Sequence, residues 1–300
     1  DFTLTYSGVT GDGDLSFTIL NNGGSPVTDL AGNSLMASVL SNAITVDNTA
    51  PGVTITANTP GSGSVTNTNS DNVSFDIAYD QDIDNGTFSL ADIQLDLTGT
   101  VTINGVSADG LFANDASLGS NVTLTADGDN QNYTLSIASV AGDGDLGITL
   151  DADAAGNGSG IQDAADNYLA SGTDQSSGTD FTIDNTAPTA SNVTISSNNG
   201  TNTDRAITSN TVEVDFTVDD QLDSDPTISF FKSGGVVVQA TPSISGTNPN
   251  YTASYVVDGS DEDGAVTFSI TFTDDAGNTV SSSVTSVSGT GSSSSVTVDN

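Results

Sequence analysis

The sequence ITVDNTAP at Ile44 to Pro51 returns as FTIDNTAP at Phe181 to Pro188, and its first part recurs as VTVDN at Val296 to Asn300. In every copy, two apolar residues separated by Thr lead into Asp-Asn, a pattern typical of a strand that runs into a turn. In the two longer copies proline fixes its own φ and favours an extended conformation for the preceding alanine. We therefore expect repeated units, each ending in a strand and a short, stiff linker.

Two further landmarks precede each copy in a constant order, first a loop rich in Gly and Asp and then a pentapeptide of the form Asp-x-x-Gly-Asn. The loop reads GDGDL at Gly11 to Leu15, GDGDL at Gly142 to Leu146, and DEDGAV at Asp261 to Val266. The pentapeptide reads DLAGN at Asp29 to Asn33, DAAGN at Asp153 to Asn157, and DDAGN at Asp274 to Asn278. These intervals predict a unit of roughly 115 to 137 residues, which is the size of one domain.

The landmarks divide the chain into three parts. Residues 49–185 and 186–300 are predicted to be whole repeats, whereas residues 1–48 carry only the landmarks from the end of a repeat. We expect this first part to lack its initial strands and to bury no core alone. Either preceding sequence or another chain would complete it.

Composition excludes several classes of function. The 300 residues include 39 acidic and two basic side chains, a formal net charge of −37, and neither Cys nor His. Without imidazole or thiolate, the chain has no His-based triad, no cysteine or histidine zinc site and no disulfide. The charge repels nucleic acids and anionic membranes, and no apolar run is long enough to span a bilayer. Cations, basic proteins and neutral glycans remain as partners.

The apolar residues predict strands. They alternate with polar residues in short runs, separated by Gly, Asn and Asp, and no long helical period is present. The clearest runs are Val73, Phe75, Ile77 and Tyr79, and Val212, Val214, Phe216 and Val218. About seven such strands in a unit of this size predict an all-β chain of tandem immunoglobulin-like β-sandwiches. A jelly roll fits the repeat length less well.

This topology brings acidic loops together where one domain meets the next. The Gly-Asp loop lies beside the exit of the last strand, while the pentapeptide and the loop after the second strand face the preceding domain. The first joint is predicted to gather Asp12, Asp14, Asp47, Asp80, Asp82 and Asp153. The second is predicted to gather Asp143, Asp145, Asp184, Asp219, Asp220 and Asp274, and the corresponding positions at the end of the last unit are Asp261, Asp263 and Asp299.

Clustered carboxylates favour a cation. Unit charges about 4 Å apart repel by roughly 1 kcal/mol in water and about 4 kcal/mol at an effective dielectric constant of 20. Calcium accepts six to eight oxygen ligands from flexible Asp-, Asn- and Gly-rich loops, whereas magnesium prefers more water and a stricter octahedron. We therefore predict Ca²⁺ at the joints, where it would turn a string of domains into an extended rod.

The repeated DNTAP, the DAAGN and DDAGN pentapeptides and the GDGD loops resemble the bacterial Ig-like repeats of giant calcium-binding surface adhesins. The resemblance covers the whole chain at the level of pattern, although the stretch from Asp80 to Leu150 is longer than usual. It implies a secreted, cell-surface stalk that calcium stiffens and that presents a distal adhesive domain to an unknown target. Its partners would be calcium, neighbouring repeats and, in a fibre, like chains.

The repeats and the charge also admit other functions. Catalysis is disfavoured because the carboxylate pairs recur once per domain, which an active site would not do. A self-assembling filament or surface-layer subunit stays open. Adaptation to high salt is at best a contributor, because Asp is concentrated in loops at the domain ends and not scattered over strand faces. A glycan-binding module would need an exposed aromatic site. The Asn residues of the pentapeptides are expected to be left-handed turn formers. Ordinary solvated loop charges are expected at Asp115, Asp127, Asp129, Asp163 and Asp166.

Overall fold

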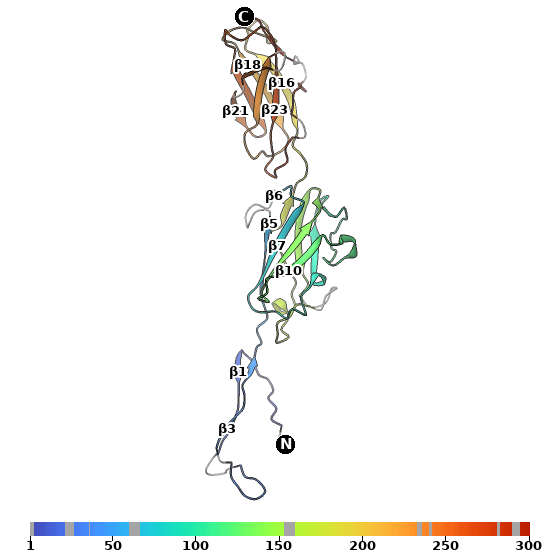
Figure 1. Ribbon diagram of the computed structural model, residues 1–300, viewed down its shortest axis with the longest axis vertical. Coiled ribbons are helices and arrows are strands. Elements are labelled where there is room, and N and C mark those ends of the chain that lie inside the picture. Colours follow the sequence, from blue (N-terminus) through green and yellow to red (C-terminus); the bar gives the residue numbers. More distant parts are fainter. Residues whose placement is uncertain are drawn as a thin grey trace.

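A computed structural model shows an elongated chain in which two β-sandwiches follow each other along one axis, preceded by a thinner segment of short antiparallel strand pairs (Figure 1). The structure describes residues 3–21, 27–35, 37–59, 67–152, 160–232, 236–239, 242–280, 283–289 and 295–300. Among them, no helix is long and apolar enough to cross a membrane. The prediction of an all-β chain of tandem immunoglobulin-like sandwiches is confirmed.

The first sandwich consists of two main sheets. One has the order β10 (Val122–Ala126), β11 (Asn132–Ala138), β7 (Asn72–Tyr79) and β5 (Val53–Thr59). The other has the order β14 (Gln175–Ser176), β13 (Gly144–Leu150), β15 (Phe181–Ile183) and β6 (Asn67–Thr68), with β8 (Ile93–Leu97) also paired to β13. The pairing of β15 with β6 is parallel, and the other pairings are antiparallel. This arrangement is that of an immunoglobulin-type sandwich.

Smaller elements complete this sandwich. They are the paired strands β9 (Thr102–Ile103) and β12 (Val140–Ala141), and the single-turn 3-10 helices η1 (Leu90–Asp92), η2 (Ala116–Leu118) and η3 (Leu169–Ser171). Four of these five elements, η1, β9, η2 and β12, lie in the stretch between Asp80 and Leu150, which is longer than expected for such a repeat.

The second sandwich repeats the plan. One sheet has the order β16 (Ala190–Ser197), β18 (Thr211–Val218), β22 (Asn250–Val256) and β21 (Ser243–Thr247). The other has the order β17 (Arg205–Ala206), β24 (Val296–Val298), β23 (Gly264–Thr271), β19 (Thr227–Lys232) and β20 (Val236–Gln239). Here again the last strand, β24, runs parallel to a short early strand, β17.

Alternation along the strands decides which residues form the cores. In β18, Val212, Val214, Phe216 and Val218 are buried, while the residues between them are exposed or half-buried. The buried residues form two separate clusters, one within Ile55 to Ile183 and one within Val193 to Val298. Each fully buried Phe, Ile, Leu or Val contributes about 1.5–3 kcal/mol relative to exposure, so each sandwich has its own source of stability.

Residues 3–48 differ from both sandwiches. Their strands pair as β1 (Gly13–Leu15) with β4 (Ile44–Val46), and as β2 (Thr18–Ile19) with β3 (Val39–Leu40). None of the described residues in this segment is buried, and apolar side chains such as Leu20 and Leu40 are more than half exposed. The described part of this segment therefore has paired strands without a buried core.

Candidate metal centre at the domain joints

Each linker is held by the Gly-Asp loop of its own unit. In each copy, the Asp of that loop that directly precedes Gly13, Gly144 or Gly264 accepts the backbone N–H of the Asn in Asp-Asn: the distance is 2.7 Å for Asn48 to Asp12, 2.7 Å for Asn185 to Asp143 and 2.8 Å for Asn300 to Asp263. The glycine after each of these aspartates has a φ between 134° and 146°, which L side chains rarely adopt. Sequence and conformation therefore recur together in all three copies.

The other oxygen of this Asp is also engaged at the two complete linkers. Thr49 Oγ1 donates to Asp12 Oδ2 at 2.5 Å, and Thr186 Oγ1 donates to Asp143 Oδ2 at 2.8 Å. The hydrogen bonds from Thr49 and Asn48 lower the pKa of Asp12 below its usual value, because they stabilise the charged form. Asp12 and Asp143 thus act as clamps on the linker.

A second clamp holds the residue that follows the linker proline. Asp80 accepts the N–H of Gly52 at 2.7 Å, and Asp219 accepts the N–H of Thr189 at 2.6 Å. Burial acts to raise the pKa of Asp219, but the hydrogen bonds from the Thr189 hydroxyl and N–H outweigh it, and the net shift is downward. The loop after β7 or β18 thus fixes the point where the chain enters each sandwich.

The second joint brings three carboxylates together. Asp184, Asp220 and Asp274 each offer one oxygen, and these oxygens lie within 4.8 Å of one another; this is the only such group of three among the described residues. Asp274 is fully buried, and the other two are half-buried. Burial raises the pKa of Asp184, and the charges of Asp220 and Asp274 raise it further. The three carboxylates of Asp184, Asp220 and Asp274 therefore repel one another.

The pentapeptide Asp274–Asn278 ties this group to the linker. Asn278 donates its backbone N–H to Asp274 Oδ1 at 2.7 Å, and its side-chain amide donates to the carbonyl of Asp184 at 2.9 Å. Asn69, from the preceding sandwich, donates its side-chain amide to Asn278 Oδ1 at 3.1 Å and its N–H to the carbonyl of Ala276 at 3.1 Å. Both sandwiches and the linker thus meet at one turn.

At the first joint, the pentapeptide with this geometry is DAADN, at Asp163 to Asn167. Asn167 donates its N–H to Asp163 Oδ1 at 3.0 Å and its side-chain amide to the carbonyl of Asp47 at 3.2 Å. Asp163 is only 3% exposed. The expectation that Asp163 is a solvated loop charge was therefore wrong, while the predicted DAAGN residue Asp153 lies outside the described residues.

The missed pentapeptide has a physical explanation. Its fourth residue adopts a left-handed conformation, with a φ of 97° at Gly277 and 68° at Asp166. Glycine is favoured at such a position, but Asp tolerates it, so a search for Asp-x-x-Gly-Asn passes over DAADN. The left-handed residue is the one before the Asn, contrary to the expectation that Asn278 itself takes this conformation.

Three of the remaining predicted residues make contacts away from the carboxylate groups at the joints. Asp14 and Asp145 each accept a hydrogen bond from a threonine hydroxyl on the neighbouring strand, at 3.1 Å and 3.3 Å. Asp82 accepts the side-chain amide of Gln131 at 2.7 Å, at the turn between β10 and β11. These carboxylates hold strands and loops together within one unit.

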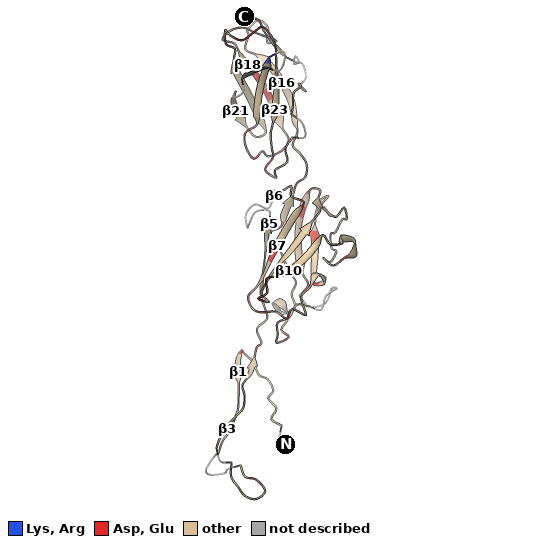
Figure 2. Cartoon of the chain, in the orientation of Figure 1, with Lys and Arg blue, Asp and Glu red and all other residues tan. Residues whose placement is uncertain are grey.

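The last three predicted residues lie at the far end of the second sandwich. Asp263 clamps Asn300, and the carbonyl of Asp261 accepts the side-chain amide of Asn300 at 2.9 Å. Asp299 forms an exposed ion pair with Arg205 at 3.7 Å. Arg205 and Lys232, the two basic residues of the sequence, both belong to this sandwich, whereas acidic residues occur along the whole chain (Figure 2).

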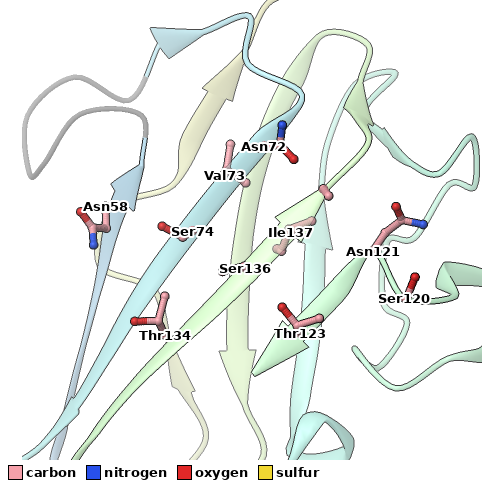
Figure 3. A pocket seen from close by; sticks show the side chains of 11 residues that line it. Asn58, Asn72, Val73, Ser74, Ser120, Asn121, Thr123, Thr134, Ser136 and Ile137 are labelled. Atoms are coloured by element: carbon pink, nitrogen blue, oxygen red, sulfur yellow. The ribbon is translucent and has the colours of Figure 1, made fainter. Parts of the chain in front are cut away.

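A hollow on the sheet formed by β5, β7, β11 and β10 is the other notable surface feature (Figure 3). It has a volume of about 420 Å³ and is lined by short polar and aliphatic side chains. Its lining residues are Asn58, Asn72, Val73, Ser74, Ser120, Asn121, Thr123, Thr134, Ser136, Ile137 and Ala138. This lining includes no aromatic ring for a sugar to stack on and no carboxylate, so the candidate site remains at the joints.

Known proteins show only weak similarity to this chain. No protein-family model matches the sequence, and no curated protein matches it. Similar solved structures include the titin domains Z1Z2 in complex with telethonin, at 13% identity and a TM-score of 0.26 over 85% of this chain and 100% of that one. A marsupial T cell receptor is similar at 12% identity and a TM-score of 0.25, over 73% of this chain and 93% of the receptor chain. Values this low assign no activity or partner to this chain.

Proposed function

We propose that this chain is a non-enzymatic structural rod, in which divalent calcium bound at a domain joint stiffens tandem sandwiches. The observation that carries this proposal is the group formed by Asp184, Asp220 and Asp274, whose oxygens lie within 4.8 Å of one another. Asp184 lies on the linker that leaves one sandwich, whereas Asp220 and Asp274 belong to the next. A cation between them would therefore join two domains.

The donor set fits calcium. Hard carboxylate oxygens supply negative charge, and the fully buried Asp274 lies where repulsion is screened least by water. Calcium accepts such oxygens together with amide and carbonyl oxygens at irregular angles, which suits ligands from separate loops better than the strict octahedron of magnesium. When bound, the ion would supply the positive charge that these three residues lack.

The mechanical effect would follow from linkage. Asp184 is part of a linker that Asp143 already clamps to the first sandwich through Asn185 and Thr186. A cation that binds only when Asp220 and Asp274 approach Asp184 stabilises the aligned joint and not the bent one. At a free calcium concentration one hundred times the dissociation constant, this stabilisation is about 2.7 kcal/mol.

Small-angle X-ray scattering of the full chain tests the proposal. Profiles would be recorded in about 10 mM calcium, because extracellular modules often bind calcium at 10⁻⁴–10⁻³ M, and then in chelator. Potassium chloride would match the ionic strength, since a net charge of −37 is itself sensitive to screening. We expect a long, rigid profile in calcium and a reversible decrease in radius of gyration on chelation. An equal response to magnesium or to potassium alone would contradict a specific calcium joint.

We further propose that the rod is the stalk of a secreted bacterial surface adhesin or extracellular fibre, displaying a distal adhesive domain. The resemblance of the DNTAP, pentapeptide and GDGD landmarks to such repeats supports this role. The absence of Cys from the sequence also agrees with it, because metal would then take the stapling role that disulfides have in many extracellular domains. Surface labelling of a source cell with an antibody against this chain would test its location.

A filament or surface-layer subunit is the second candidate, and residues 3–48 favour it. Their apolar side chains are exposed, with Leu20 at 63% and Ile44 at 68%, and would be covered if strands of a like chain completed this unit. Sedimentation velocity across a concentration series separates the two candidates. A stalk stays monomeric, whereas a filament subunit forms growing assemblies that lose their contacts when residues 3–48 are removed.

A further inference from the structure

We propose that the side-chain amide of Gln81 takes the place of the cation at the first joint, so that this joint is held closed without calcium. The inference rests on the calcium role proposed above for the second joint, and adds that the two joints of one chain differ in their ion requirement.

Gln81 and Asp220 occupy the same position in their sandwiches. Each is the second residue after the strand that ends at Tyr79 or Val218. Neighbouring residues make the same backbone hydrogen bonds in both sandwiches. Before the compared position, the N–H of Asp80 donates to the carbonyl of Gly52, and the N–H of Asp219 donates to that of Thr189. After it, the N–H of Asp84 donates to the carbonyl of Gln162, and the N–H of Asp223 donates to that of Thr273. The bridges Ile83 to Asp163 and Leu222 to Asp274 also correspond.

The surroundings of the two residues correspond as well. Asp163 and Asp274 are both buried, and each closes a turn with an Asn whose side-chain amide reaches the carbonyl of the linker Asp, namely Asp47 or Asp184. The first joint thus presents Asp47, Gln81 and Asp163 where the second presents Asp184, Asp220 and Asp274. The two sets differ in charge by one carboxylate.

Gln81 makes the contacts expected of a substitute for an ion. Its Nε2 donates to Asp163 Oδ2 at 2.9 Å and to the carbonyl of Thr49 at 3.0 Å. One amide group therefore bridges the buried carboxylate of the sandwich and the linker that enters it. At the second joint the residue in this position is Asp220, which brings acceptor oxygens and a negative charge instead of donors.

Hydrogen exchange measured by mass spectrometry on the full chain reads the two joints separately. Peptides around Thr49 and Asn167 report on the first joint, and peptides around Thr186 and Asn278 report on the second. In wild type, we expect chelation to accelerate exchange at the second joint by up to about a hundredfold when the starting calcium is one hundred times the dissociation constant. Exchange at the first joint should stay within about twofold, because no bound ion is lost there.

Reciprocal substitutions exchange the two behaviours. Gln81→Asp should make the first joint sensitive to chelator, and Asp220→Gln should make the second insensitive. Gln131→Ala is the matched control, because the Gln131 amide also donates to an aspartate, Asp82, but within the sandwich. In this variant, the backbone amides of the first joint should exchange at the wild-type rate.

The outcomes separate this inference from the calcium proposal. Equal sensitivity of both wild-type joints to chelator would overturn the role of Gln81 and leave calcium in place. Insensitivity of both would instead overturn calcium at the second joint. The tether itself is tested in chelator by Gln81→Ala: about tenfold faster exchange at the first joint is expected from losing two hydrogen bonds, and no acceleration would overturn the inference.

Discussion

The two joints of this chain share a backbone frame and differ in the group at their centre. Both have a linker clamped by a Gly-Asp loop, a second clamp after the proline, and an Asp-Asn turn whose amide reaches the linker. At the first joint Gln81 donates to Asp163, whereas at the second Asp220 lies beside Asp184 and Asp274. At this position the first joint therefore has an amide that donates to a carboxylate, whereas the second joint has a third carboxylate.

This difference shows which parts of the repeat are structural. Asp12, Asp143 and Asp263 occupy equivalent positions and accept the same backbone N–H in every copy. Protein donors reach both carboxylate oxygens of Asp12 and Asp143, and one oxygen of Asp263. The acidity of a loop is thus a poor guide to metal binding unless one also knows which donors reach each carboxylate.

The largest expected effect comes from replacing the buried Asp of the two turns. Asp163→Asn places a donor where Gln81 and Asn167 both donate to Oδ2, which should cost about 1–3 kcal/mol of the first sandwich's stability, with or without calcium. Asp274→Asn should lower the stability of the second sandwich by less than this in chelator, because it also removes one of three repelling charges. In calcium it should lower the stability by more, because it removes a ligand.

Urea unfolding followed by hydrogen-exchange mass spectrometry measures each sandwich separately, because the two cores are separate clusters. The conservative control is Asp223→Asn, an exposed residue of the loop that holds Asp220. Calcium-dependent destabilisation by Asp163→Asn, or none by Asp274→Asn, would remove the proposed difference between the joints.

A smaller effect is expected from the turn asparagines. Asn167→Ala and Asn278→Ala each remove a side-chain amide that donates to the turn Asp and to a linker carbonyl, and each should cost about 1 kcal/mol. The loss should be greater at Asn278, because its Oδ1 also accepts from Asn69. Asn33→Ala is the control, since Asn33 makes only the bond within its own turn among the contacts described. Equal melting temperatures for wild type and both joint variants would show that these turn asparagines do not contribute to the stability of the sandwiches.

The smallest expected effect is a pH dependence confined to the second joint. The pKa of Asp184 is raised above its unfolded value by burial and by the neighbouring charges. Its protonated form therefore favours the folded joint: this contribution is complete below the unfolded pKa and is lost as the pH rises through the folded pKa. In chelator, and after correction for intrinsic exchange, peptides around Thr186 should be better protected at mildly acidic pH than at neutral pH.

Calcium should reverse this trend, because protons and the ion compete for the same oxygens. The corresponding peptides of the first joint serve as the internal control. If the protection around Thr186 in chelator falls on acidification as much as the protection around Thr49 does, Asp184 is not the group responsible.

Several features of the fold could be predicted from the sequence because they depend on local order. Alternation in β7 and β18 assigned the core faces correctly, since successive side chains of a strand point to opposite sides. The recurrence of the Gly-Asp loop placed it beside the end of the last strand, and the structure adds that Asp12 and Asp143 hydrogen-bond to the linker there. The site was only partly predictable. Asp184, Asp220 and Asp274 do meet at the second joint, but Asp145, predicted for the same joint, accepts from Thr182 instead. At the first joint, the predicted Asp82 accepts from Gln131.

By itself, the sequence determined that the chain is a series of all-β units with acidic linkers, because strand alternation, left-handed turns and proline restraint are properties of neighbouring residues. Only the tertiary structure decided that Asp163 closes the first joint and that Gln81 lies between it and the linker. These contacts depend on the direction in which a loop leaves its strand and on which distant segment comes close to it. Both are set by strand pairing between residues far apart in the sequence. Consecutive residues such as Asp80, Gln81 and Asp82 accordingly reach three different partners.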